Sequence, residues 1–175
     1  MKKRRAARQD GKIAVLLHAL DEAYDRRAWH GTALKGSLRG VTARQAAWRP
    51  APGRHNIREL AVHAAYWKYR VRRRLTGEKR GSFPMNGNNW FELSGADEKT
   101  WRSERDLLER EHRALCRAVA KLPPGRLAGA LPGTSRRSAL REIAGIALHD
   151  VYHTGQIQLL KALRKKQRER QGWTA

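Results

Sequence analysis

The chain has 175 residues, a length that suits one domain with a single sizeable core. Its formal net charge is +22, and 40% of its residues are apolar, slightly below the usual share for a globular protein. No apolar run approaches the ~18 residues that span a bilayer, and no long apolar stretch typical of a signal peptide follows the basic N-terminus. Because Cys116 is the single cysteine, no disulfide can form within the chain. These features argue against a membrane-spanning protein and a disulfide scaffold, and they favour the reducing cytoplasm.

Three stretches carry most of the positive charge. Residues 1–10, 68–80 and 161–175 have net charges of +4, +6 and +5, which is 15 of the 22 units. Charge runs at chain ends are commonly solvated tails, and this is the simpler interpretation of two of these stretches. The alternative is that the basic surface attracts anions, nucleic acid among them.

The first predicted helix covers residues 11–29, where apolar side chains recur at helical spacing: Ile13, Leu16, Leu17, Leu20 and Tyr24. Residues 30–40 predict a short broken helix after it. Thr42 and Gln45 then have the three-residue spacing of a capping box, in which each side chain bonds to the other's backbone N–H.

The second long helix has clear signals at both of its ends. Asn56 is the expected N-cap and Glu59, three residues on, completes a second capping box. Gly77 is a natural C-terminal stop, so the helix is predicted over residues 57–76. Residues 78–96 contain Gly, Asn and Pro without a period, which predicts a loop.

Two further helices are predicted, over residues 97–122 and 138–166, and no segment alternates like a β-strand. Four long amphipathic helices predict an all-α fold, a four-helix bundle with the short broken helix after its first helix. We expect one bundle domain over residues 10–167, preceded by a disordered basic arm at 1–9 and followed by a basic tail at 168–175.

Two histidines stand four residues apart on the last predicted helix. His149 and His153 differ by about 40° around a helix, so both rings point to one side, one turn apart. Ile146, Gln156 and Ile157 flank them, which indicates that this face is turned inward. The spacing suits two nitrogen ligands of one metal ion. Such pairs also occur by chance, and hydrogen-bonded core histidines are the alternative.

His63 on the second long helix offers a third nitrogen. It borders an apolar stripe made by Leu60, Ala64 and Trp67, so the two helices can present three imidazoles to one point. Three neutral imidazoles leave at least one coordination position for water or substrate. A divalent cation held there is a Lewis acid that lowers the pKa of a bound water or thiol. On ligand type we expect Zn²⁺ or Ni²⁺, ahead of Fe or Mn.

Neighbouring side chains suggest how these imidazoles are held. Gln156 is a candidate partner for a ligand nitrogen or a bound water, and Asp150, Glu59 or a backbone carbonyl can accept an imidazole N–H. No catalytic residue is assigned, and Cys116 is expected to pack in the third long helix. The remaining histidines are expected to be packing or surface residues: His18, His30, His55 and His112.

Several motifs together resemble one known family. HAAYW at residues 63–67 and HDVYHTGQI at residues 149–157 occur with WRPAPGRHNIREL at 48–60 and Asn89-Trp90, in the order and spacing of the DinB-like superfamily. The resemblance covers roughly residues 11–165. It implies a four-helix bundle and carries over His63, His149 and His153 as metal ligands.

The resemblance is less specific about chemistry. Many members of the superfamily are homodimers, some transfer thiols such as bacillithiol or mycothiol, and others are described only as metal-dependent hydrolases. We therefore expect a metal-dependent enzyme whose partners are a small-molecule thiol or electrophile. The alternative is a basic, sequence-independent nucleic-acid-binding or stress-response module with a structural or vestigial metal site.

Overall fold

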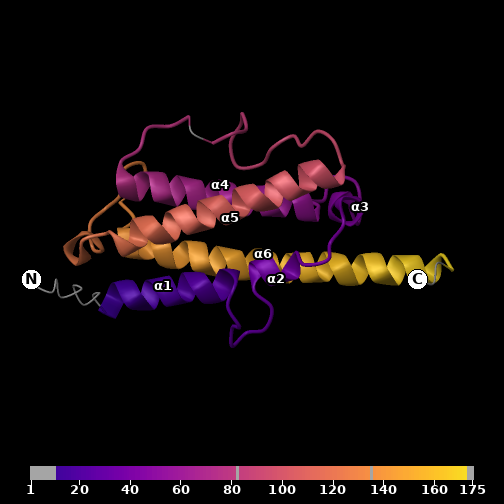
Figure 1. Ribbon diagram of the computed structural model, residues 1–175, viewed down its shortest axis with the longest axis horizontal. Coiled ribbons are helices and arrows are strands. Elements are labelled where there is room, and N and C mark those ends of the chain that lie inside the picture. Colours follow the sequence, from indigo (N-terminus) through magenta and orange to yellow (C-terminus); the bar gives the residue numbers. More distant parts are fainter. Residues whose placement is uncertain (1–10, 82, 135, 173–175) are drawn as a thin grey trace, which may run out of the picture.

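The computed structural model of the protein describes residues 11–172 except 82 and 135. This part of the chain contains six α-helices, a single 3-10 turn and no β-strand (Figure 1). The predicted all-α class is therefore confirmed, while the arm predicted at residues 1–9 lies outside the described residues. The helices are α1 (Gly11–Tyr24), α2 (Leu34–Ser37), α3 (Ala43–Ala47), α4 (Ile57–Thr76), α5 (Glu98–Ala120) and α6 (Ala139–Arg170).

The four long helices lie side by side (Figure 1). Helices α1 and α4 each pack against both α5 and α6. The short helix α2 continues along α6 beyond the end of α1, and α3 packs against α4 and α5. The loop between α4 and α5 passes over α4, which places its residues above the middle of the molecule.

The predicted helix signals have the expected geometry. Both capping boxes form, Thr42 with Gln45 at α3 and Asn56 with Glu59 at α4. Gly77 ends α4 with a φ of 78°, a left-handed conformation that glycine adopts at little cost.

Two helix ends differ from the prediction. Helix α1 ends at Tyr24 instead of residue 29, because the N–H groups of Asp25 and Arg26 both bond to the carbonyl of Asp21 and close a turn. Helix α6 continues to Arg170, into the segment predicted as a tail, and residues 173–175 lie outside the described part. Leu140, an apolar residue in the first turn of α6, is 45% exposed.

The core consists of two apolar clusters separated by a polar layer. One cluster contains Trp101 and Ile157, and the other contains Leu115 and Ile143. Each long helix places one residue of the layer between the clusters: Tyr24, Lys68, His112 and Asp150. The Lys68 ammonium pairs with the Asp150 carboxylate, and both side chains are 0% exposed. The Tyr24 ring stacks on the His112 ring at 3.8 Å and lies 5.1 Å from the Lys68 Nζ atom.

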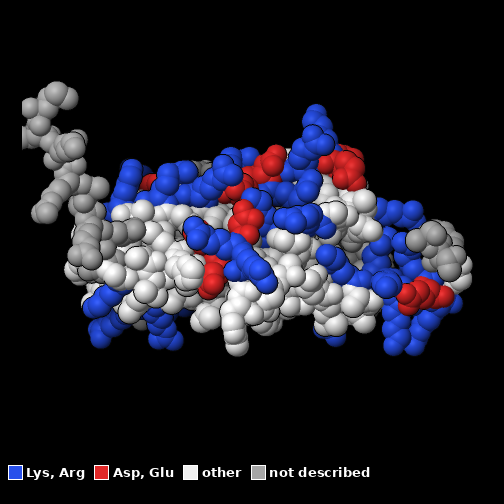
Figure 2. All heavy atoms as spheres, turned by 60° about the horizontal axis from the view of Figure 1, so that its bottom comes forward, with Lys and Arg blue, Asp and Glu red and all other residues white. Residues whose placement is uncertain are grey.

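Basic residues dominate the surface, but the pattern is uneven. Figure 2 shows Lys and Arg along the upper edge of one face, at its lower left and at the C-terminal end of α6, with uncharged areas between them that a mixed group of basic and acidic side chains interrupts near the middle. Several arginines of α4 are instead paired within the fold, Arg58 with Glu104, Arg72 with Glu111 and Arg74 with Glu142.

Candidate metal centre

The fold brings the three predicted histidines together. His63 lies in the second turn of α4, whose start is held by the Asn56 cap, and His149 and His153 occupy successive turns of α6. His63 and His153 are buried, and His149 is partly exposed. These residues are brought together by the packing of α4 against α6.

The Nε2 atoms of the three rings converge. The Nε2 of His149 lies 3.1 Å from the Nε2 of His63 and 3.0 Å from the Nε2 of His153. Ligands about 2.0–2.1 Å from a tetrahedral zinc ion are ~3.3 Å apart, so these nitrogens are spaced almost as a metal requires.

Hydrogen bonds behind two of the rings determine where their protons lie. The Nδ1 of His63 lies 2.9 Å from the backbone carbonyl of Asn89, and the Nδ1 of His153 lies 2.6 Å from the Oε1 of Gln156. An oxygen acceptor at Nδ1 requires the proton there, so a neutral ring turns the Nε2 lone pair inward. Gln156 therefore contacts the Nδ1 of a candidate ligand.

With hydrogen bonds alone, no position of the His149 proton satisfies the facing lone pairs of all three rings. A cation can satisfy them together. If His149 carries its proton on Nε2, that proton can bond to only one of the two facing lone pairs. If the proton is on Nδ1, three lone pairs face one another, and Nδ1 is buried without a hydrogen-bond partner in the described structure. A divalent ion accepts all three lone pairs, so the residues present fit a metal ion.

The surroundings also keep the imidazoles neutral, the form that binds metal. Burial lowers the pKa of His63 to about 4 and that of His149 to about 3, and it lowers the pKa of His153. The indole ring of Trp90 stacks on His63 at 3.9 Å, which shields that ring from water.

A cavity of about 510 Å³ opens on the centre. His63 and His149 line it, together with apolar residues that include Trp67, Val71 and Leu148. Arg137 and Arg141 also line it. Arg137 pairs with Glu142 at 2.8 Å, whereas the described structure shows no ion pair for the Arg141 side chain.

Two residues predicted as imidazole acceptors have other partners. Asp150 pairs with Lys68, and Glu59 accepts hydrogen bonds from Arg49 and His55. The acceptor for His63 is instead the backbone carbonyl of Asn89, whose φ of 69° is unusual for a non-glycine residue. The sequence showed Asn89-Trp90 only as part of the family resemblance and gave no signal of this role.

The other histidines are not part of the converging group, although His55 stacks on Trp90 at 3.5 Å. His18, His30 and His55 are exposed, as expected, and His112 is buried in the polar layer. Cys116 packs on α5 with its Sγ 3.5 Å from the Nε2 of His112, and burial raises the pKa of its thiol to about 11. A thiol of that pKa is protonated at neutral pH and is a poor nucleophile.

The fold and the convergent imidazoles define an all-helical protein with a three-histidine group compatible with metal binding. A family model described as the DinB superfamily matches residues 26–157, which is more than half of the sequence, and the chain belongs to this superfamily. No curated protein and no solved structure matches the chain.

Among the described residues, no helix has both the length and the apolar character needed to cross a membrane. This agrees with the absence of a long apolar run from the sequence.

Proposed function

We propose that the protein is a metal-dependent enzyme that activates a small-molecule thiol or water, as a thiol S-transferase or hydrolase-like enzyme. His63, His149 and His153 are the proposed ligands, and Zn²⁺ or Ni²⁺ is the proposed ion. The observation that carries the proposal is the convergence of three Nε2 atoms beside an apolar cavity of about 510 Å³. A bound divalent ion supplies Lewis acidity, which lowers the pKa of a thiol or water next to it.

The side chains around the centre supply binding, orientation and exclusion of water. Asn89 and Gln156 hold the rings of His63 and His153 in the orientation that turns their lone pairs inward. The apolar wall that includes Trp67 and Leu148 suits an electrophile with a hydrophobic body. The Arg141 guanidinium at the cavity can hold a carboxylate of the thiol substrate.

For the transferase reaction, the thiol sulfur forms a bond to an electrophilic carbon of the second substrate. With an aryl chloride, the carbon–chlorine bond breaks, chloride leaves with the bonding electrons, and the thiol proton passes to solvent. No oxidant or reductant is consumed. With their Nε2 lone pairs on a bound ion, the three imidazoles would not compete for this proton.

The first test is the metal content of the purified protein by elemental analysis. We expect about one divalent ion per chain, and loss of that ion in the His149→Ala/His153→Ala double variant. The matched control is His18→Ala/His30→Ala, which removes two exposed histidines and should keep the metal. Circular dichroism of both variants separates loss of ligands from loss of fold.

The second test is turnover of a chloro-dinitroarene with a panel of low-molecular-weight thiols. Metal-dependent product formation that is lost in the double variant supports a transferase. If the protein binds its ion but turns over no thiol, the transferase assignment is wrong. If it binds no ion even after reconstitution, the metal proposal itself is wrong.

We also propose that the protein is a homodimer and acts in the cytoplasm. The outer face of α6 carries exposed apolar side chains at positions 148, 152, 159 and 163, a stripe that a second copy could cover. The single cysteine suits a reducing compartment.

A further inference from the structure

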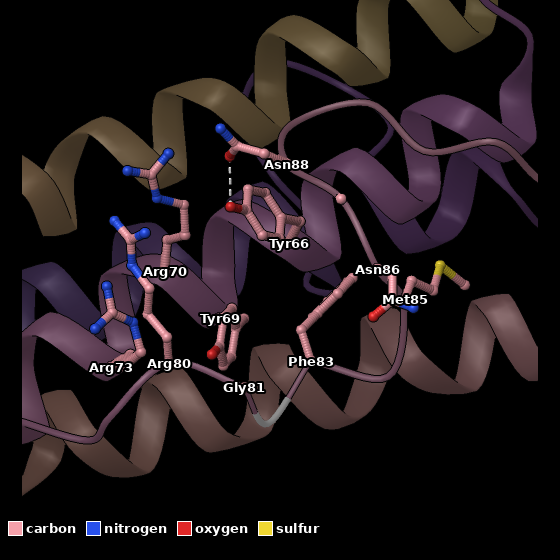
Figure 3. Close-up of a pocket in the computed structure, with 11 residues that line it drawn as sticks. Tyr66, Tyr69, Arg70, Arg73, Arg80, Gly81, Phe83, Met85, Asn86 and Asn88 are labelled. Carbon is pink, nitrogen blue, oxygen red and sulfur yellow. Dashed lines mark hydrogen bonds between the residues drawn. The ribbon is translucent and has the colours of Figure 1, made fainter.

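A second cavity, of about 310 Å³, lies between α4 and the loop that follows it. Figure 3 shows three arginine side chains at one end of this cavity and aromatic rings beside them. Helix α4 contributes two of the arginines and the loop contributes the third: Arg70, Arg73 and Arg80. The rings are those of Tyr66, Tyr69 and Phe83.

Three basic residues of α4 that neighbour these arginines in the sequence have carboxylate partners. Lys68 pairs with Asp150, Arg72 with Glu111 and Arg74 with Glu142. Within the described chain, Arg70, Arg73 and Arg80 form no ion pair. Three positive charges therefore face one cavity without a counter-charge.

The hydrogen bonds of Arg73 are also incomplete. Its Nη1 donates to the backbone carbonyl of Glu78 at 3.3 Å, while its Nε is buried with no partner in the described structure. A buried donor without an acceptor costs free energy that a ligand oxygen can recover. The Arg73 charge interacts favourably with the helix dipole at the C-terminal end of α4. This interaction does not explain why Arg70 and Arg80 are also placed at the cavity.

The Arg70 guanidinium is held against aromatic rings. Its Cζ lies 4.8 Å from the Trp67 ring centroid and 5.8 Å from that of Tyr66. Burial and the neighbouring arginines lower the pKa of Arg70, in agreement with the absence of an ion pair for it among the described residues. Cation–π contacts position such a charge without neutralising it, so it stays available to an anion.

We propose that Arg70, Arg73 and Arg80 bind the phosphate or pyrophosphate group of a small-molecule ligand. Guanidinium groups match phosphate oxygens with paired N–H donors, and three uncompensated charges suit a multiply charged group better than one carboxylate. A volume of about 310 Å³ is at the small end of the range for ligand pockets, which fits a compact ligand.

The pocket and the metal centre share one loop. The Tyr66 hydroxyl at the pocket donates to the Asn88 Oδ1 at 2.6 Å, and the next residue, Asn89, accepts the hydrogen bond of His63. A phosphorylated ligand in this pocket therefore contacts the segment that orients a proposed metal ligand. The proposal does not depend on the metal, since none of the three arginines lines the metal cavity.

The test is isothermal titration of the metal-free protein with pyrophosphate, because a metal ion would itself bind this probe. We expect a 1:1 complex that is weakened at least about tenfold by Arg70→Gln/Arg73→Gln, because this variant removes two charged hydrogen-bonding partners of the phosphate oxygens. The control variant Arg102→Gln/Arg110→Gln removes the same charge from the exposed side of α5 and should change the affinity less than about twofold. If the double variant at the pocket does not fold, Arg80→Gln in the loop is expected to weaken binding in the same direction.

Three results would overturn the proposal. One is equal weakening by the pocket and control variants, which would show attraction by net charge alone. Another is no pyrophosphate binding by the wild-type protein at millimolar concentration. The third is duplex DNA that binds through Arg70 and Arg73 while pyrophosphate neither binds nor competes, which would assign the pocket to a nucleic-acid backbone.

Discussion

Lys68 and Asp150 form an ion pair that is completely shielded from solvent, between the two apolar clusters of the core. Such a pair contributes little net stability, because desolvation of both charges offsets their attraction. It does penalise any packing of α4 against α6 that separates the two charges. We infer that it specifies how these helices align, and hence that it helps to bring His63 opposite His149.

This interpretation predicts an asymmetric response to mutation. Lys68→Met leaves the Asp150 carboxylate buried without a partner and should cost about 3–5 kcal/mol of unfolding free energy. The double variant Lys68→Met/Asp150→Leu removes both charges and should recover most of that loss. Urea denaturation measures both effects. If the double variant is as unstable as the single one, the pair acts by packing and not by charge.

His112 belongs to the same polar layer and predicts a pH dependence of stability. Burial, followed by the nearby Lys68 charge, lowers the pKa of His112 to about 3, whereas an unfolded imidazole titrates near 6.5. Below pH 6.5 the His112 imidazole is therefore protonated in the unfolded chain but stays neutral in the folded protein. The free energy of unfolding should therefore fall as the pH decreases from 6.5 towards 5. The decrease is up to about 1.4 kcal/mol per pH unit for each such histidine.

The measurement is urea denaturation at several pH values in the presence of a chelator. His63 and His149 have lowered pKa values too and add to the slope. His112→Gln should make the slope shallower, and His30→Gln, at an exposed position, is the matched control variant. An unaltered slope in His112→Gln would show that the buried imidazole is not responsible.

At the scale of whole elements, two sides of α6 bear on the proposed function. One side carries His149 and His153, and an adjacent side carries apolar side chains that are 41–70% exposed: Leu148, Tyr152, Leu159 and Leu163. Leu148 lies where the two sides meet, because it also lines the cavity beside His149. These positions follow one another at intervals close to helical repeats, so they form a single stripe along the helix. A stripe of this kind is typical of a surface that another helix covers.

The proposed dimer makes this stripe a target for mutation. Leu159→Arg should convert the dimer to a monomer in light scattering without lowering the helical content, because the position is solvent-exposed in the monomer. Val15→Arg, at an exposed apolar residue of α1, is the matched control and should leave the dimer intact. A wild-type protein that is monomeric at high concentration would contradict the dimer.

The features that could be predicted well from the sequence are those formed by residues close together in the chain. The capping boxes at Thr42 and Asn56 depend on side chains three residues apart, so the sequence contains all of their parts. The pairing of His149 with His153 is likewise local. The end of α1 was not predicted, because the turn after Tyr24 contains no glycine or proline before Gly31.

Features made by distant segments could not be predicted in this way. The carbonyl that orients His63 belongs to Asn89, and any residue could have supplied a backbone oxygen. Asp150 was one of three candidate acceptors of an imidazole proton, but on α6 its carboxylate pairs with Lys68. Leu140 satisfies the helical period yet remains exposed, because periodicity shows which face turns inward and not where packing begins.

For the molecule as a whole, the structure shows that several of the basic residues behind the net charge of +22 are paired with carboxylates. The run at residues 68–80 has a net charge of +6 in the sequence, but Lys68, Arg72 and Arg74 are each paired with a carboxylate in the fold. Three of the remaining basic residues, Arg70, Arg73 and Arg80, line a small cavity and not an extended groove. The basic surface in Figure 2 is spread over edges and one end of the face shown. Such a distribution attracts polyanions without offering a shaped binding site.

Duplex DNA should therefore bind weakly and without sequence preference. We expect fluorescence anisotropy to show binding at about 50 mM salt that falls by orders of magnitude by about 200 mM, as counterion release requires. Unrelated duplexes should bind equally, and His149→Ala/His153→Ala should not change the affinity, because the metal centre takes no part. Tight binding that persists at about 200 mM salt and discriminates between sequences would instead favour the nucleic-acid-binding function over the enzyme.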